Sequence, residues 1–168
     1  EANDSSVPIL AITTDVATTS RGKYPLTALD QEGLFRPVTK WNTSLDSAAR
    51  LPANIRQAFR AMTTGRPGAV HLALPFDTQK GDVSDAEIWA DKRHRHFPAE
   101  RAAPDRQAIR DAVDVLEGAT SAVAICGGGP VLAGAENVLQ KLAELLDLPI
   151  ATTVSGQGSI AETDPHAI

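Results

Sequence analysis

A run of glycines, Gly127-Gly128-Gly129-Pro130, follows an apolar segment and precedes a helical pattern. Phosphate groups and nucleotides often bind at such a turn in α/β proteins, because glycines admit a ligand to the backbone and helix N-terminal N–H groups favour anions. A tight turn without a ligand is the alternative. The dinucleotide fingerprint G-x-G-x-x-G is not met, because Leu132 stands at its third glycine and the next strand ends in Thr152-Thr153 without an acidic residue. No G-x-x-x-x-G-K-[ST] loop is present either, so an NAD dehydrogenase and a P-loop NTPase are both disfavoured.

Two polar side chains in the first half of the chain are further candidates. Arg66, in Gly65-Arg66-Pro67-Gly68, lies between a predicted helix and a predicted strand. Its guanidinium could grip an anion or a flavin edge, or it could cap the last carbonyls of the helix. Gln31, beside Glu32, lies in a predicted loop, where its amide could contact a ligand at the carboxyl edge of a parallel sheet or simply face solvent.

Other reactive residue types favour structural interpretations. Cys126 is predicted to be a buried strand residue, because no base accompanies it in the sequence. His94 and His96 could chelate a metal but lack further ligands nearby, and His71 alternates with apolar neighbours as a packing or interface residue. Ser155 lacks the leading glycine of the G-x-S-x-G elbow and is not predicted to be a nucleophile.

Composition narrows the class of protein. The 168 residues carry 42% hydrophobic residues, a net charge of −5 and one cysteine. A globular α/β core is therefore feasible, and the lack of a basic stripe argues against nucleic-acid binding. No apolar run approaches the ~18 residues that span a bilayer, so no membrane partner is expected. The single cysteine suits a reducing, cytoplasmic setting.

Hydrophobic periodicity predicts parallel sheets with βαβ crossovers. Continuous apolar runs, typical of strands covered on both faces, predict strands at 9–13, 69–74, 122–126 and 149–153. Helical stripes are centred on Ile55–Met62, Ile109–Leu116 and Ala135–Leu146. The first should begin near Pro52 and stop at Gly65, and the second should begin after Pro104-Asp105 and stop at Gly118.

Two partial domains are predicted, at residues 1–80 and 104–168, joined by a polar linker over 81–103. The chain opens almost at once on a strand and lacks a starting Met, and it ends on a loop-like stretch. We therefore expect a fragment of a longer protein.

In their order along the chain, these blocks resemble the thiamine-diphosphate-dependent enzyme family typified by the catalytic subunit of acetolactate synthase. The resemblance rests on motifs in both halves of the chain. In the first half they are Val7–Thr13, Gln31-Glu32, Arg36–Trp41, Leu51–Phe59, Thr64–Gly68 and Leu74-Pro75. In the second half they are Gly127–Pro130, Leu148–Thr153 and Gly156–Gly158.

The resemblance implies that residues 1–80 are the C-terminal half of the pyrimidine-binding domain. Residues 104–168 would be the N-terminal half of the Rossmann-like central domain. Gln31 would face the cofactor and the substrate across a dimer interface. In flavin-containing members, Arg66, the turn of Gly127, Gly128 and Gly129, and the segment of Thr153, Val154 and Ser155 would lie along FAD.

The same resemblance implies thiamine diphosphate with Mg²⁺ and a 2-keto acid substrate such as pyruvate. It also implies a homo-oligomeric enzyme, dimer or tetramer, with a transferase or lyase activity of the kind used in branched-chain amino acid biosynthesis. The glutamate that activates thiamine would precede Glu1, and the Gly-Asp-Gly…Asn element that holds magnesium and diphosphate would follow Ile168. The chain alone is therefore expected to be inactive.

Two positions depart from the synthase pattern. The synthases usually have an aromatic residue where this chain has Asp30, and a lysine where it has Phe76. Acetolactate formation is thus less well supported than membership of the wider carboligase and decarboxylase group. The alternatives from other classes are a catalytically silent flavin- or nucleotide-binding module and a purely structural member of the same fold.

Overall fold

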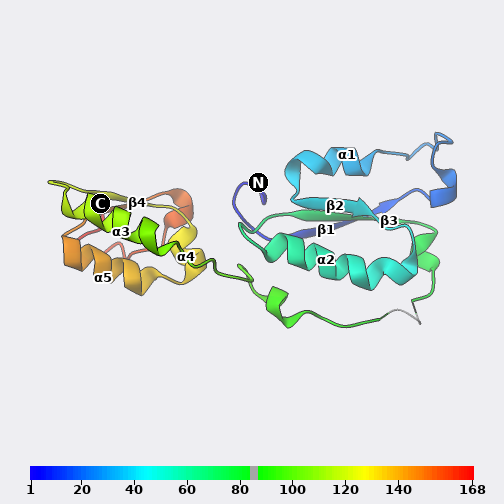
Figure 1. Cartoon of the computed structure of the whole chain (residues 1–168). Helices are drawn as coiled ribbons and strands as arrows, with labels where there is room; N and C mark the ends of the chain where they lie inside the picture. The colour runs from blue at the N-terminus through cyan, green and yellow to red at the C-terminus, as the bar shows by residue number, and fades with distance from the viewer. Residues whose placement is uncertain (84–86) are drawn as a thin grey trace. The chain divides into compact units, whose positions relative to one another are not determined.

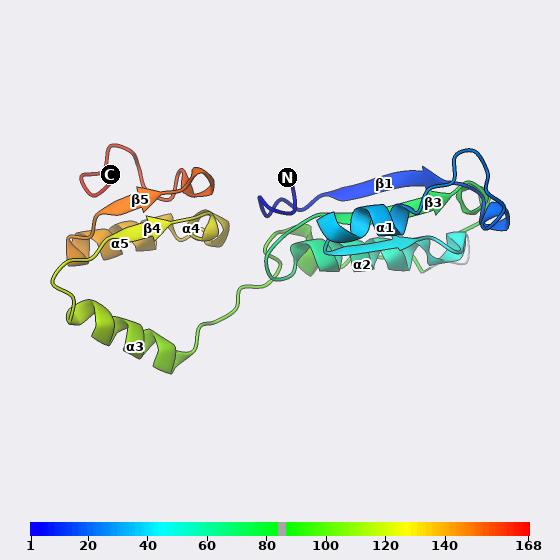
Figure 2. The same cartoon turned by 90° about the horizontal axis from the view of Figure 1, so that it is seen from above.

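The computed structural model describes residues 1–83 and 87–168. The chain divides into two compact units, Glu1–Glu100 and Arg101–Ile168, each of which is described by itself. Figures 1 and 2 show the elements of each unit. No helix in the described residues has the length and apolar character needed to cross a membrane.

The first unit is built on a parallel three-stranded sheet of order β1-β3-β2. The strands are β1 (Leu10–Asp15), β2 (Trp41–Ser44) and the central β3 (Val70–Pro75). Thr13 of β1 and Ser44 of β2 both pair with Ala73. The carboxyl ends of the three strands therefore meet at one edge of the sheet.

Two helices cover opposite faces of this sheet, as Figures 1 and 2 show. The longer helix α2 (Leu51–Thr63) packs Ala58 and Met62 against Val70 and forms the apolar core. It has a proline in its first turn, and Gly65 follows it with a positive φ of 64°, as the sequence predicted. The short helix α1 (Gln31–Phe35) lies on the other face, which carries the polar side chains of His71 and Asn42.

The segment after β3 also contributes to the first unit. It forms short 3₁₀ turns at Thr78–Lys80 and Lys92–Arg95. His94 is buried, with its Nδ1 2.9 Å from the Thr63 hydroxyl, and the Ala99 N–H donates to the Thr63 carbonyl at 2.8 Å. Much of the described part of the predicted linker thus packs along α2; its residues 84–86 lie outside the described residues.

The second unit has a parallel pair of strands, β4 (Ala124–Cys126) and β5 (Ile150–Thr152). Helix α3 (Arg106–Glu117) begins at Asp105, whose carboxylate accepts from the Gln107 and Ala108 N–H groups. Helices α4 (Gly129–Ala133) and α5 (Glu136–Leu146) follow β4. Cys126, Ala143, Ile150 and Ile160 form the core of this unit.

The parallel α/β architecture predicted from the sequence is confirmed, with three corrections. Gln31 and Glu32 form the first turn of α1 instead of lying in a loop. Strand β2 was not predicted, because Trp41–Ser44 is short and polar. The apolar run leading into β1 predicted burial on both faces, but β1 is an edge strand and Ile12 is 53% exposed.

Replacing Leu72 by alanine should destabilise the first unit by about 2–5 kcal/mol, because Leu72 is fully buried on the central strand and its loss leaves a cavity. Denaturant unfolding followed by tryptophan fluorescence measures the change. Leu26→Ala is the matched control, since Leu26 is fully exposed and its loss should change stability by less than about 0.5 kcal/mol. Equal effects of the two substitutions would contradict the placement of β3 at the centre.

Candidate functional site

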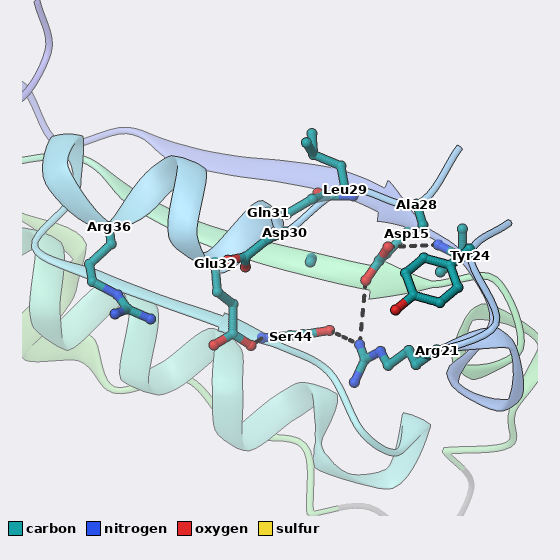
Figure 3. Close-up of a pocket in the computed structure, with 13 residues that line it drawn as sticks. Asp15, Arg21, Tyr24, Ala28, Leu29, Asp30, Gln31, Glu32, Arg36 and Ser44 are labelled. Carbon is teal, nitrogen blue, oxygen red and sulfur yellow. Dashed lines mark hydrogen bonds and ion pairs between the residues drawn. The ribbon is translucent and has the colours of Figure 1, made fainter. Parts of the chain in front are cut away.

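A cavity of about 420 Å³ lies at the carboxyl edge of the first sheet. Its walls include Asp15 at the end of β1, Ala73 of β3 and Ser44 at the end of β2. Gln31 and Glu32 enter from α1, and Arg21 and Tyr24 enter from the loop after β1 (Figure 3). This is the edge at which open parallel sheets bind their ligands.

Gln31 is fixed in this wall by hydrogen bonds on both ends of its amide. Its Nε2 donates to the Thr14 carbonyl at 2.7 Å, and its Oε1 accepts from the Thr13 hydroxyl. A side-chain amide has two N–H donors and two acceptor lone pairs. One donor and one lone pair of Gln31 therefore remain for a ligand.

The first turn of α1 is set by Asp30. Its carboxylate accepts from the Gly33 N–H at 2.9 Å, as an N-cap does. A Cβ on Gly33 would lie 2.8 Å from the Asp30 Cγ, so a larger residue there would displace the Asp30 carboxylate from its present position. The residue that departs from the synthase pattern thus has a local role, which is to start the helix that presents Gln31.

Glu32 holds α1 to β2. Its Oε1 accepts from the Ser44 N–H at 3.0 Å, and its backbone carbonyl accepts from the Asn42 amide at 2.8 Å. The two members of the Gln31-Glu32 pair therefore bond to opposite edge strands, Gln31 to β1 and Glu32 to β2.

A cationic group crosses the cavity. The Arg21 Nη2 lies 2.5 Å from the Ser44 hydroxyl and 3.4 Å from the Asp15 carboxylate, as Figure 3 shows. Arg36 also lines the cavity. The side chain of Asp15 is only 10% exposed, so its charge is compensated by Arg21 and by the Val16 N–H, which donates at 2.7 Å. The cavity can thus bind a polar ligand, since charged groups of both signs line it.

The loop that carries Arg21 is anchored by Asp77, which follows β3. The Asp77 carboxylate accepts from the Thr18 hydroxyl and the Thr18 N–H, the latter at 2.9 Å. These hydrogen bonds, first the one from the Thr18 hydroxyl, lower the pKa of Asp77 below its ordinary value of 3.8. Phe76, the second departure from the synthase pattern, is 56% exposed beside this anchor, with the Lys80 ammonium 4.0 Å from its ring centroid.

Arg66 lies away from this cavity. Its Nε donates to the Ser6 hydroxyl at 2.7 Å, and its Nη2 donates to the Asp4 carbonyl. It does not cap α2; the Lys40 ammonium instead donates to the Thr64 and Arg66 carbonyls, both at 2.7 Å. Arg66 is exposed, and its guanidinium ties the N-terminal segment to the end of α2.

In the second unit, the glycine turn and the segment after β5 lie together, as a shared site requires. A Cβ on Gly128 would lie 3.1 Å from the Ser155 carbonyl, and one on Gly127 would lie 3.9 Å from the Thr153 hydroxyl. Gly128 thus allows the two turns of the chain to pack closely, whereas a Cβ on Gly127 would make only an ordinary contact and Gly129 faces open space. Thr153, Val154 and Ser155 are exposed.

The cysteine and histidines for which the sequence favours structural roles are mostly buried in the packed parts of each unit. Cys126 is buried in the core of the second unit, and His71 is fully buried in β3. His94 is buried against α2, and the His96 Nε2 accepts from Arg95 at 2.9 Å. The described residues contain no group of three or more His, Cys, Asp or Glu side chains placed to hold a metal ion.

The candidate residues predicted from the sequence do not include Asp15, Arg21, Ser44 or Asp77, although all four help to form this cavity or its anchor. Asp15 and Asp77 had a usable signal, because each is an acidic residue at or just beyond the end of a strand. Ser44 ends a strand that was not predicted, and Arg21 follows no motif, so neither could be selected from the sequence.

A parallel sheet with a polar cavity at the carboxyl ends of its strands, as in the first unit, is typical of ligand-binding α/β proteins. Residues 109–168 match the family model described as "Thiamine pyrophosphate enzyme, central domain". Over 99% of its length the chain is 34% identical to the "Probable acetolactate synthase large subunit" of Methanococcus aeolicus. Over 96% it is 36% identical to the glyoxylate carboligase of Escherichia coli O157:H7.

A solved structure agrees in fold. The X-ray structure of a protein from Mycobacterium smegmatis, assigned to the thiamin diphosphate-dependent enzymes, superposes with a TM-score of 0.82. It matches 99% of this chain and 32% of its own length, at 21% sequence identity. Residues 109–168 are thus identified as part of a thiamine pyrophosphate enzyme central domain, and nearly the whole chain is similar in sequence to acetolactate synthase large subunits and to a glyoxylate carboligase. The chain spans 28% of the length of the Methanococcus relative and 26% of the carboligase.

Replacing Asp77 by asparagine should loosen the loop that carries Arg21, because the hydrogen bonds from Thr18 lose their charged acceptor. Since the folded pKa of Asp77 lies below 3.8, its contribution to stability is present above pH 3.8 and is lost as the pH falls through the folded value. Asp77→Asn should therefore flatten the acid dependence of the unfolding temperature.

Hydrogen exchange of the amides of residues 18–22 measures the loosening directly. Asp46→Asn is the control, since its ion pair with Arg50 is exposed on both sides and should contribute little. Unchanged amide protection in Asp77→Asn would argue against the anchor.

Proposed function

We propose that this chain is part of a thiamine-diphosphate-dependent enzyme that acts on 2-keto acids such as pyruvate, as a carboligase or decarboxylase. The observation that carries the proposal is the position of Gln31. Its amide is pinned at the carboxyl edge of a parallel sheet, beside a polar cavity, with one donor and one lone pair still available.

The cavity suits the polar groups of the proposed cofactor and substrate. Amide, carboxylate and guanidinium groups line it, and these can hydrogen-bond an aminopyrimidine ring or a keto acid. When bound, thiamine diphosphate supplies the electron sink for loss of the substrate carboxylate. Mg²⁺ is proposed to bind with the diphosphate through residues outside these 168.

The residues of this chain position the cofactor and the substrate and enclose them. Gln31 orients a carbonyl or ring nitrogen through its free N–H and lone pair. Arg21 and Arg36 supply positive charge to a substrate carboxylate, as a guanidinium does in carboxylate recognition. No proton transfer is assigned to Gln31, because a neutral amide is neither an acid nor a base near pH 7.

We propose that the residues after β3 help to determine whether the enzyme is a synthase or another kind of carboligase. The relatives include both acetolactate synthases and a glyoxylate carboligase. Phe76 places an aromatic ring where the synthases usually carry a lysine, and it is half exposed. We propose a carboligase or decarboxylase of this wider group, with the keto acid set partly by Phe76.

A homo-oligomer is proposed because the loop beside the cavity is exposed and apolar. Tyr24 is 95% exposed, Leu26 is fully exposed and Leu29 is 58% exposed. Tyr24 and Leu29 line the cavity, so a second subunit covering this loop would also close the cavity from water.

FAD is proposed as a second cofactor. In the second unit, Gly129 is open, and the exposed segment Thr153–Ser155 lies beside the glycine turn. These residues could contact a flavin. Flavin binding by Arg66, in the first unit, stays a prediction from the family resemblance. Bound flavin without keto acid turnover in the intact protein would favour the catalytically silent flavin module instead.

Gln31→Leu should lower kcat/KM for the keto acid by about 10²-fold, because an amide that orients the reacting groups is lost while the size of the side chain is kept. Steady-state carbon dioxide release by the intact protein measures the effect. Gln57→Leu is the matched control, an exposed glutamine on α2. Equal rates in the wild type and in Gln31→Leu would overturn the assignment of Gln31.

The 168-residue chain purified alone should neither retain thiamine diphosphate nor turn over pyruvate. The resemblance gives no counterpart among these residues for the activating glutamate or the diphosphate anchor. Calorimetric titration with thiamine diphosphate and Mg²⁺, together with a pyruvate assay, tests this. Turnover by the purified chain would refute the expectation.

A further inference from the structure

We propose that His71 is a positioning residue for Gln31 and acts through the hydroxyl of Thr13. The proposal rests on the function proposed above, since it extends the role of Gln31. His71 would not contact the substrate. It would fix the orientation of the amide that does.

A continuous hydrogen-bond chain joins the three side chains. The His71 Nε2 lies 2.8 Å from the Thr13 Oγ1, and the same oxygen bonds to the Gln31 Oε1. The far end of the Gln31 amide is tied to the Thr14 carbonyl at 2.7 Å. β3, β1 and α1 are thus linked through polar groups on one face of the sheet.

The hydrogen bonds that join these side chains can be donated in only one direction. The Thr14 carbonyl can only accept, so the nitrogen of the Gln31 amide faces it and the amide oxygen faces Thr13. The Thr13 hydroxyl has one hydrogen, which it must donate to that oxygen. Its own lone pair can then only accept, so His71 must carry its proton on Nε2.

The surroundings of the ring support this tautomer. His71 is fully buried, and its Nδ1 has no hydrogen-bond partner, as fits a nitrogen that carries only a lone pair. Burial lowers the pKa of His71 below 6.5, and the opposing charge of Glu32 raises it by less. The ring is therefore neutral near pH 7 and has a single N–H to donate.

The ring is also held sterically. Phe35, at the end of α1, stacks on His71 with ring centroids 3.7 Å apart and an interplanar angle of 4°. His71 therefore contacts α1 at one end through this stack and at the other end through Thr13 and Gln31. A residue that served packing alone would need the stack but not the Nε2 proton.

Two pairs of substitutions separate positioning from packing. His71→Phe keeps an aromatic ring against Phe35 and removes the donor, whereas His71→Gln restores a donor near the position of Nε2. Thr13→Val removes the hydroxyl at nearly constant shape, and Thr13→Ser keeps it. His96→Phe is the matched control at an exposed histidine of the same unit.

Nuclear magnetic resonance of the full chain, with ¹⁵N-labelled histidine and glutamine, tests the hydrogen-bond chain without cofactor or turnover. His71 should show the Nε2–H tautomer. Exchange of the Gln31 side-chain amide protons should rise at least about tenfold in Thr13→Val and His71→Phe, and should return toward wild type in Thr13→Ser and His71→Gln.

An Nδ1–H tautomer, or unchanged Gln31 exchange in folded Thr13→Val, would overturn the proposal. If His71→Phe does not fold, the wild-type tautomer and the Thr13 pair still decide. In the intact enzyme, His71→Phe should lower kcat about tenfold, with rescue by His71→Gln. If Gln31→Leu leaves turnover unchanged while the exchange results hold, the proposed function fails and the hydrogen-bond chain stands.

Discussion

The parallel pairing of β3 with β1 on one side and β2 on the other is the constraint on which the first unit depends. It brings the ends of all three strands to one edge, so that Asp15, Ser44 and Ala73 can line a common cavity. It also gives the sheet two unlike faces. The face under α2 is apolar and supplies the core, while the face under α1 carries hydroxyl, amide and imidazole groups. The face that stabilises the first unit and the face that carries the candidate site are therefore opposite faces of one sheet.

α1 depends on this division. A helix of five residues is far below the length at which helices are stable alone, and α1 has no fully buried residue. It is held by the cap from Asp30, by the bonds of Gln31 to β1 and by those of Glu32 to β2. The same contacts that retain the helix orient Gln31. A change that weakens the polar face would thus move the candidate catalytic amide before it unfolds the core.

Much of this fold could be predicted from the sequence, because hydrophobic periodicity and the residues that start and end helices depend on local structure. β3, α2, α3 and α5 were predicted for that reason, down to Pro52, Gly65 and Asp105 at the helix ends. β2 and α1 could not be, since both are short and their stability comes from partners distant in the chain. Gln31 was selected through the family resemblance, whereas the role of His71 depends on β1–β3 pairing that no local pattern encodes. The glycine turn was correctly predicted to join a strand to a helix, but its packing against Ser155 depends on a contact between distant segments and could not be predicted.

The loop between β1 and α1 is fixed at both ends and exposed in the middle. Thr18 is tied to Asp77 at one end, Asp30 caps α1 at the other, and Tyr24 and Leu26 between them are almost fully exposed. Lengthening a loop at an exposed position carries only a small entropic cost. Insertions and deletions between these two ties can therefore accumulate without shifting the sheet or the helix. The wall of the cavity can thus change, and with it the ligand, at little cost to the scaffold behind it.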